Sequence, residues 1–448
     1  MSRRRGRRVP DDFVHPPTLG LVTSAQRLRS LARADVTLGV VLLITMATLV
    51  VAAALKSYCL TDWTPGHQPK TCYNDIQTLW FQRDMAAHEA PYSSLPKETH
   101  RDGELVKVEL GAGQIEYPVL SGVFAWAASL PAESHSSYLV YTAIALTPFA
   151  LLTSLALYRL VGRRALIFAA SPQLAAYAFL NWDLLPVAAT AVGLWAWRRE
   201  KQALAAVAFS LGACAKIWPG FLLLPLVVHL LTTRRVRSAV TVVGAAVAAA
   251  LAVNLPFMIN NFDGWFAPYL MQSVRLNDLT TNSVWYWLFD PTDFGTVNRA
   301  SALAVIVGWA VIVGYGFRRR RAAGEYPWVQ VGAAMVTSYI VLGRVDSPQY
   351  GIWLLPFLAV VAVPPRWLAI FAVTDIWLWL QWSWLWSAPD WMLWTAMAAR
   401  GLALVGLTVV LLRSPLAVAQ WPGSRLSARS PVTSSQTSTA AVATGAAN

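Results

Sequence analysis

The chain has 448 residues, of which 56% are hydrophobic and only 13% are charged. A soluble domain cannot bury that proportion of apolar side chains, so the composition excludes a soluble protein and favours an all-α polytopic membrane protein. The formal net charge of +13 does not indicate nucleic-acid binding, because the basic residues form clusters between hydrophobic runs, the pattern of cytoplasmic loops. These clusters lie at residues 3–8, 163–164, 198–201, 234–237 and 318–321.

The first segments of the chain predict a tail followed by a membrane anchor. Residues 1–34 are rich in arginine and are expected to form a basic cytoplasmic tail. Residues 35–55 are the first hydrophobic span, and this run is longer than the apolar core of a secretory signal, so we expect an uncleaved anchor. Residues 35–413 as a whole are predicted to form one transmembrane domain.

The loop at residues 56–136 is predicted to be external, and a short amphipathic helix is expected within it, on the membrane surface with its polar side toward a cavity. Helical spacing places apolar side chains on one face and polar side chains on another, namely Ile76, Leu79 and Trp80 against Asp75, Thr78 and Gln82. A carboxylate held there can act as a general base, so Asp75 is the candidate catalytic residue. The alternative is that Asp75 only caps the helix, because Asp is a favoured N-cap residue.

The same external loop contains two further features. Cys59 and Cys72 are expected to form a disulfide, because the outside of the cell permits one; two free thiols are the alternative. Glu116 and Tyr117 are candidate sugar or acceptor contacts. They follow a polar stretch, 97–113, that is expected to be mobile. The apolar run after them, 119–130, is too short to cross the bilayer and predicts an interfacial or re-entrant helix.

The basic clusters assign the remaining spans alternately inward and outward, to a total of about twelve. Four of them are shorter than the ~20 residues needed to cross a bilayer and are predicted to meet at a cavity: 165–180, 183–197, 202–215 and 217–231. The others are expected at 137–160, 238–257, 300–317, 328–342, 350–363, 367–386 and 391–412. A second external loop, 258–298, and a disordered cytoplasmic tail, 414–448, complete the prediction.

Polar residues at the predicted outer ends of the spans are candidates for substrate contact. Asn181 and Asp183 lie at an external turn, where Asp183 could equally cap a helix. Lys216 either binds a phosphate as a point charge or extends to the interface. In the second external loop, Arg275 is a cation with hydrogen-bonding neighbours, Asn277 and Asn282, and simple solvation of the loop is the alternative.

Arg344 lies where one predicted span ends and the next begins. It could form a buried ion pair with Asp346 or contact a phosphate, with Gln349 and Tyr350 on a sugar. Asp375 and Arg400 stand at comparable depth in neighbouring spans, and the cost of leaving either unpaired predicts a structural ion pair.

Several patterns are missing from the sequence. It has no Walker loop, no G-x-G-x-x-G and no H-E-x-x-H pattern, so a nucleotide-driven pump and a membrane zinc protease are unsupported. The six histidines are scattered and predict no metal site. The tryptophans of 377–394 are predicted to be interfacial anchors, although aromatic faces also stack on sugars.

The layout of the chain resembles that of the C-type (GT-C) membrane glycosyltransferases. It has a first span, then a long external loop with an early Asp on a surface helix, and then short spans. Two motifs are similar to those of the actinobacterial glycosyltransferase 87 group: Gly212-Ala213-Cys214-Ala215-Lys216 with Trp218-Pro219, and Ser347-Pro348-Gln349-Tyr350 with Trp353–Pro356.

The resemblance implies a plasma-membrane enzyme that transfers a sugar, expected to be mannose, from a polyprenyl-phosphate donor to an envelope glycolipid or polysaccharide. It places catalysis on the external face with Asp75 as base, and Asp346 departs from the apolar or aromatic residue expected there.

The expected reaction inverts the anomeric carbon. Lys216, Arg275 and Arg344 would stabilise the charge of the leaving phosphate, so no cofactor or metal is demanded. The alternative function is a transporter or flippase of a lipid-linked sugar, which would use the same cavity without a base and would have inverted symmetry. A scaffold protein of the envelope would leave the outward polar residues unexplained. The expected partners are therefore the bilayer, the lipid-linked sugar and the acceptor.

Overall fold

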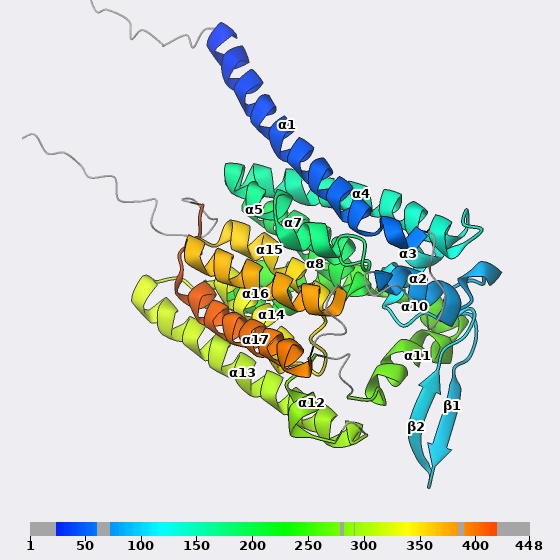
Figure 1. Cartoon of the computed structure of the whole chain (residues 1–448). Helices are drawn as coiled ribbons and strands as arrows, with labels where there is room; N and C mark the ends of the chain where they lie inside the picture. Colours follow the sequence, from blue (N-terminus) through cyan, green and yellow to red (C-terminus); the bar gives the residue numbers. More distant parts are fainter. Residues whose placement is uncertain (1–23, 61–71, 278–281, 291, 384–388, 419–448) are drawn as a thin grey trace, which may run out of the picture.

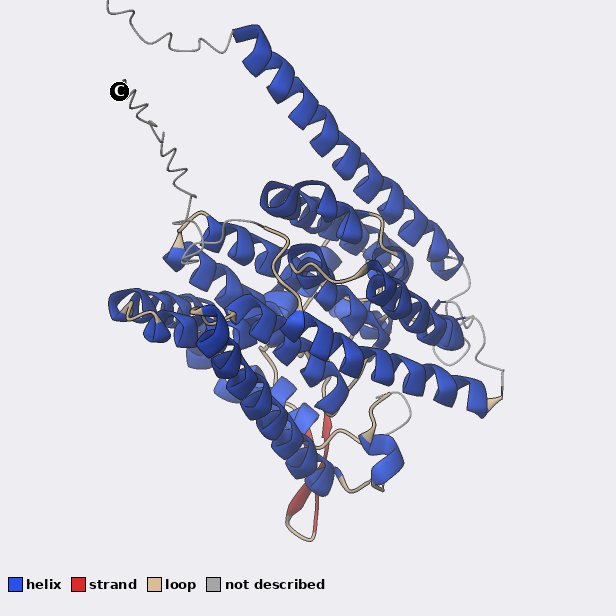
Figure 2. Cartoon of the chain, turned by 90° about the vertical axis from the view of Figure 1, so that its left-hand side faces the viewer, coloured by secondary structure: helices blue, strands red, loops and turns tan. Residues whose placement is uncertain are grey.

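The computed structural model describes residues 24–60, 72–277, 282–290, 292–383 and 389–418. The predictions for the arginines at 3–8, for residues 384–388 of the Trp-rich stretch and for the tail beyond 418 lie outside the described residues. What is described is a helical body with one β-hairpin, and the hairpin projects beyond the helices at one end (Figures 1 and 2).

The elements follow one another along the chain with short connections. The first half has α1 (Ser24–Leu55), α2 (Asp75–Gln82), α3 (Val119–Ser129), α4 (His135–Val161), α5 (Leu166–Ala169), α6 (Pro172–Tyr177), α7 (Leu184–Arg198) and α8 (Gln202–Ala215). The second half has α9 (Leu223–Thr232), α10 (Val236–Asn260), α11 (Phe262–Ser273), α12 (Trp285–Leu288), α13 (Phe294–Ala323), α14 (Trp328–Leu342), α15 (Gly351–Val360), α16 (Pro365–Ser383) and α17 (Asp390–Arg413). Short 3-10 turns begin α9 and α15, namely η5 (Trp218–Leu222) and η7 (Pro348–Tyr350).

The helices identify a membrane protein. Five segments among the described residues are long and apolar enough to cross a bilayer: Thr37–Leu55, His135–Ala169, Val236–Asn260, Phe294–Ala323 and Asp390–Arg413. The short spans predicted at 183–197 and 202–215 are indeed short helices, α7 and α8. The total of about twelve spans stays a prediction.

The centre of the body is formed by helices that are apolar on every side. All ten residues of α15 are buried, and α14 is buried along most of its length. A helix that is hydrophobic all round has no face for water and must be surrounded by protein or lipid. Here α15 packs against α4, α5 and α7, and α14 packs against α9, α13 and α17. The loop between α14 and α15, residues 343–350, is thereby held at a fixed place in the core.

A β-hairpin lies in the stretch 97–113 that was expected to be mobile, within a body that is otherwise helical as predicted. Strands β1 (Lys97–Arg101) and β2 (Glu104–Glu109) pair in antiparallel register. Asp102 and Gly103 form the turn with φ of 52° and 80°, the left-handed geometry for which Asp-Gly is suited. Apolar side chains of β2 and the residues after it pack against the end of α11: Leu105, Val108 and Leu110 with Ala267, Leu270 and Val274. The hairpin is therefore attached to the body.

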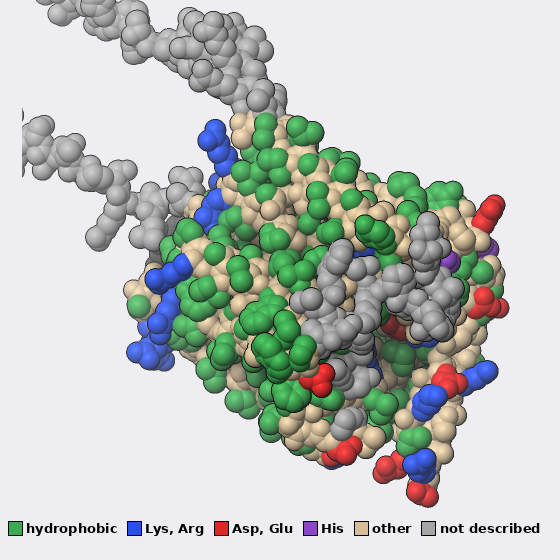
Figure 3. Space-filling view, in the orientation of Figure 1, with side chains coloured by type: hydrophobic (Ala, Val, Ile, Leu, Met, Phe, Trp, Pro, Cys, Tyr) green, Lys and Arg blue, Asp and Glu red, His purple; other side chains and the backbone are tan. Residues whose placement is uncertain are grey.

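Both predicted tails are partly structured. α1 begins at Ser24, inside the segment expected to be a tail. Beyond α17, Leu416 forms a β-bridge with Val361, which attaches the start of the C-terminal segment to the end of α15. Lys and Arg side chains gather at the end of the molecule where α13 finishes, and acidic side chains lie toward the hairpin end (Figure 3). Lys and Arg side chains also lie at the hairpin end, so it is the gathering of basic side chains at the other end that matches the charge pattern from which an inner side was predicted.

Candidate active site

Asn74, and not Asp75, is the N-cap of α2. The Asn74 Oδ1 accepts a hydrogen bond from the Gln77 N–H at 2.8 Å, which satisfies one of the free N–H groups at the helix start. The Asp75 N–H donates to the Leu180 carbonyl at 2.9 Å. The capping alternative for Asp75 is therefore wrong, and its carboxylate is available for other contacts.

The two faces of α2 separate as the sequence predicts. Ile76, Leu79 and Trp80 are buried, while Asp75, Thr78 and Gln82 line a cavity of about 1140 Å³, which Leu79 also borders. We call this space the large cavity. Its walls come from α2, the hairpin, the residues after α11 and the start of α13.

The Asp75 carboxylate receives four hydrogen bonds, unequally divided. Asn181 Nδ2 donates to Oδ2 at 2.6 Å, Tyr117 Oη at 3.1 Å and Gln349 Nε2 at 3.4 Å. Among the described residues, Tyr73 Oη is the one donor to Oδ1, at 2.8 Å. Since a carboxylate oxygen has two lone pairs, Oδ1 has room for a further partner and Oδ2 is fully occupied.

Both phenols beside Asp75 remain hydrogen-bond donors. The negative charge of Asp75 is the main cause that holds the pKa of Tyr73 well above its ordinary value. Burial does the same for the pKa of Tyr117, with the Asp75 charge as the next cause. Neither tyrosine ionises near neutral pH, so each keeps its proton directed at the carboxylate.

Lys216 is not the free point charge that the sequence suggested. Its Nζ lies 2.7 Å from Asp183 Oδ1, a carboxylate with a side chain only 1% exposed. The same oxygen accepts a hydrogen bond from Trp353 Nε1 at 2.8 Å. The rings of Tyr350, Trp353 and Tyr117 surround the ammonium at 5.0, 5.3 and 5.7 Å from their centroids, within the range of cation–π attraction. Lys216 and Asp183 thus neutralise each other beneath the site, and Asp183 makes no capping bond.

Arg344 retains unused donors in a buried position. Its Nη1 donates to the Gln272 carbonyl at 2.7 Å and to Asn298 Oδ1, while its Nε and Nη2 are buried without a partner among the described residues. Burial, and then the charge of Arg275, lower the pKa of Arg344 to about 10. Arg275 itself lines the large cavity. Two cations near each other, with unused N–H groups, form a site for an anion.

Asp346 does not pair with Arg344, which settles the alternative left open by the sequence. It pairs with Arg400 Nη1, and Arg400 Nε also donates to Asp375 Oδ1 at 2.7 Å. The predicted contact of Asp375 with Arg400 is thus present and is extended by a second carboxylate. Arg400 and Asp375 are fully buried. This triad ties α16 and α17 to the loop before α15, and within the described part of the chain Arg344 has no carboxylate partner.

The remaining predicted residues divide into two groups. Glu116 lines the large cavity, with its carboxylate bound by Arg83. Asn277 and Asn282 are buried elsewhere; Asn277 accepts from Ser283, and Asn282 accepts from Trp382. Neither asparagine lines the large cavity, and their sugar contacts stay predictions.

The thiols of Cys59 and Cys72 are neighbours, joined by a hydrogen bond rather than a disulfide. Lys56 reaches the adjacent backbone, with its Nζ 2.8 Å from the Tyr73 carbonyl. The pair therefore lies directly before the segment that carries Tyr73 and Asp75, and the disulfide stays a prediction.

Sequence reasoning missed Tyr73 and Arg83. Tyr73 stands two positions before Asp75, outside the helical pattern that identified the other cavity residues. The only signal for it was a phenol close to a candidate base. Arg83 ends α2 as its C-cap residue, and its partner Glu116 is too distant in sequence for any local pattern to reveal.

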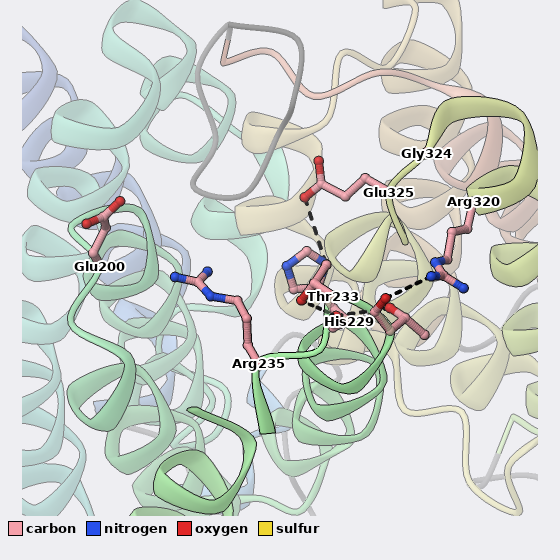
Figure 4. A pocket seen from close by; sticks show the side chains of 8 residues that line it. Glu200, His229, Thr233, Arg235, Arg320, Gly324 and Glu325 are labelled. Carbon is pink, nitrogen blue, oxygen red and sulfur yellow. Dashed lines mark hydrogen bonds and ion pairs between the residues drawn. The ribbon is translucent and has the colours of Figure 1, made fainter. Parts of the chain in front are cut away.

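A second, smaller cavity lies at the basic end of the molecule, away from these groups (Figure 4). It has a volume of about 370 Å³ and is lined by charges of both signs, including Arg235, Arg320 and Glu325. His229 lies in its wall, 3.8 Å from the Glu325 carboxylate. None of the predicted site residues lines it, so the candidate active site is the large cavity.

Comparison with known families adds one finding. The model of glycosyltransferase family 87 matches residues 116–348, just over half of the chain. The match includes Tyr117, Asn181, Arg275 and Arg344, and it begins after Asp75. None of the curated protein sequences matches the chain.

Proposed function

The chain belongs to glycosyltransferase family 87 and is a membrane glycosyltransferase, and from this premise we propose the reaction that it catalyses. The protein transfers mannose from a polyprenyl-phosphate donor to an envelope glycolipid or polysaccharide and inverts the anomeric carbon. The reaction takes place on the outer side of the plasma membrane, at the end of the molecule opposite the basic clusters.

The observation that supports this proposal is the unequal hydrogen bonding of the two Asp75 carboxylate oxygens. Three donors hold Oδ2 and fix the plane of the group, while Oδ1 keeps a lone pair beside the cavity. Oδ1 then removes the proton from an acceptor hydroxyl as that oxygen attacks the anomeric carbon. The new glycosidic bond forms, the bond from the anomeric carbon to the phosphate oxygen breaks, and the electron pair leaves with the phosphate.

The leaving phosphate requires positive charge and no proton. Arg344 offers two buried N–H groups that have no partner in the part of the chain that the structure describes, and Arg275 adds a second cation. Such preorganised donors stabilise charge that develops in the transition state. Lys216, already paired with Asp183, has a different role in this proposal: it holds Tyr350 and Trp353 in place beneath the reacting sugar.

The test is sugar transfer by the purified protein from labelled polyprenyl-phosphate mannose to envelope lipid extracts. Asp75→Asn keeps the shape of the side chain and removes the base, so we expect transfer to fall roughly 10²–10⁴-fold while donor binding is retained. The matched control is Asp84→Asn, an exposed carboxylate near the end of α2 that does not line the large cavity.

Three results would change the proposal. Equal transfer by wild type and Asp75→Asn removes Asp75 as the base. Transfer of another sugar in preference to mannose changes only the identity of the sugar in the proposal. No transfer by either protein, with donor crossing liposomes that contain them, would favour the flippase.

A further inference from the structure

The large cavity extends far beyond the atoms that the proposed reaction needs. Asp75 and Glu116 lie in one part of its wall, and the hairpin and the start of α13 form another. Its volume of about 1140 Å³ exceeds the ~300–1,000 Å³ that encloses a drug-sized ligand. One reacting sugar leaves most of this space unfilled.

Strand β1 presents alternate side chains to the cavity. Thr99 and Arg101 of β1 line it, whereas Glu98 and His100 do not, as expected when successive side chains of a strand point to opposite faces. Glu104 pairs with Arg101 in the strand register and also lines the cavity. The apolar contact of β2 with α11 holds this surface in place. In β2, Glu104 and Lys107 line the cavity together with the apolar Val106 and Val108. The hairpin is therefore a fixed wall whose lining is mainly polar.

The charges of the wall balance. Apart from Asp75 and Arg275, which the proposed reaction uses, three basic and three acidic side chains among the described residues line the cavity: Arg101, Lys107 and Arg299 against Glu104, Glu116 and Asp293. A wall without net charge gives no general attraction to a polyanion. Guanidinium groups donate hydrogen bonds and carboxylates accept them, and a sugar hydroxyl can do both, so this mixture suits a chain of hydroxyl groups.

We propose that the large cavity is the acceptor site and that the acceptor is a neutral glycan chain of several sugars lying along the hairpin. This rests on the proposed function. The terminal sugar reaches Asp75, and the preceding sugars contact the inward face of the hairpin through Arg101 and Glu104. The hairpin projects beyond the helices (Figure 2), so the rest of the glycan leaves the protein along it.

The experiment compares acceptors of increasing length, from a monosaccharide glycoside to a tetrasaccharide, with a matched tetrasaccharide that carries a carboxylate on each sugar. In the wild type, the acceptor KM falls about tenfold or more from the shortest to the longest neutral chain, the worth of one or two hydrogen bonds. The acidic chain shows no such gain. In Arg101→Ala with Glu104→Ala, the dependence on length disappears, while the KM for donor and for the monosaccharide acceptor stay unchanged.

The control is Glu98→Ala with His100→Ala, which changes the outward face of the same strand and should behave as wild type. A second measurement uses Asp75→Asn, in which binding of the neutral tetrasaccharide is followed without turnover. If Asp75→Asn binds the neutral tetrasaccharide but the wild type transfers no sugar to it, the proposed function is refuted and the glycan site still stands. Three outcomes would refute the acceptor site. The acceptor KM of the wild type could be independent of chain length, or the acidic chain could be preferred. The control variant could also lose the dependence on length as fully as Arg101→Ala with Glu104→Ala.

Discussion

The residues around Asp75 fix the orientation of its carboxylate. Asn181, Tyr117 and Gln349 come from three separate parts of the chain and all reach Oδ2. A carboxylate held by several donors is restrained from rotating, so in the proposed reaction its orientation is set before substrate arrives. Lys216 contributes to this order through the aromatic rings that it holds, and its charge is already neutralised by Asp183.

Arg344→Gln tests the anion site at the residue scale. The substitution removes the buried Nε and Nη2 groups that have no partner, so we expect the donor KM to rise at least about tenfold with little change in the acceptor KM. Steady-state kinetics at varied donor concentration measures this. Arg366→Gln, an exposed residue of α16, is the control. An unchanged donor KM would assign the phosphate to other groups.

Cys59 and Cys72 give a second test at this scale. If the predicted disulfide forms in the cell, it closes a short loop, and its loss should lower stability by about 3 kcal/mol. Peptide mass mapping without reductant detects the bond, and the melting temperature of Cys59→Ser with Cys72→Ser measures its effect. Cys214→Ser is the control, because this buried thiol lies in α8. Alkylation of both thiols in protein purified without reductant would refute the pairing.

At the scale of elements, the junction of η7 with α15 depends on a glycine. A Cβ on Gly351 would lie 2.5 Å from Asp375 Oδ2, so Gly351→Ala should disturb the triad and destabilise the protein by about 1–3 kcal/mol. Gly244→Ala in α10 is the control, since its Cβ meets nothing within 4 Å and alanine favours a helix. Thermal unfolding in detergent compares them; equal melting temperatures would show that the triad adapts.

Local sequence patterns predicted the secondary-structure elements more accurately than they predicted the contacts between those elements. The faces of α2 follow from helical spacing alone, because Asp75, Thr78 and Gln82 are neighbours along one short helix. The Asp375–Arg400 contact followed from the cost of leaving a buried charge unpaired. The hairpin was missed because its charged residues suggested a solvated loop, although Asp102-Gly103 and the alternation in β2 were signals for strands.

The pairing of charges could not be read from the sequence. Asp346 is two positions from Arg344, yet it binds Arg400, because the packing of α17 brings that guanidinium to the loop. Lys216 likewise meets Asp183 across the junction of α7 and α8. In each case tertiary packing selected a partner that is distant in the sequence.

At the scale of the whole molecule, the triad makes stability depend on pH. Burial raises the pKa of Asp346 to about 6, above the ordinary value near 3.9. The folded state therefore holds the proton more tightly than the unfolded state, and this contribution to stability, at most about 3 kcal/mol, is present below pH 4 and is lost as the pH rises to about 6. Asp346→Asn cannot titrate, so its melting temperature should change less between pH 4 and 6. Parallel curves for the two proteins would contradict this assignment.

The site is also assembled late in time. Asp75 and Gln349 are separated by 274 residues, and Arg344, the proposed phosphate ligand, lies beside Gln349 in the chain. During synthesis, a nascent chain that has inserted α1 and α2 has the base but neither of these partners. It can neither orient its carboxylate fully nor retain a lipid phosphate. If the proposed roles of Asp75 and Arg344 hold, the chain consumes no donor until α14 and η7 have left the ribosome, and a prematurely terminated chain is inert.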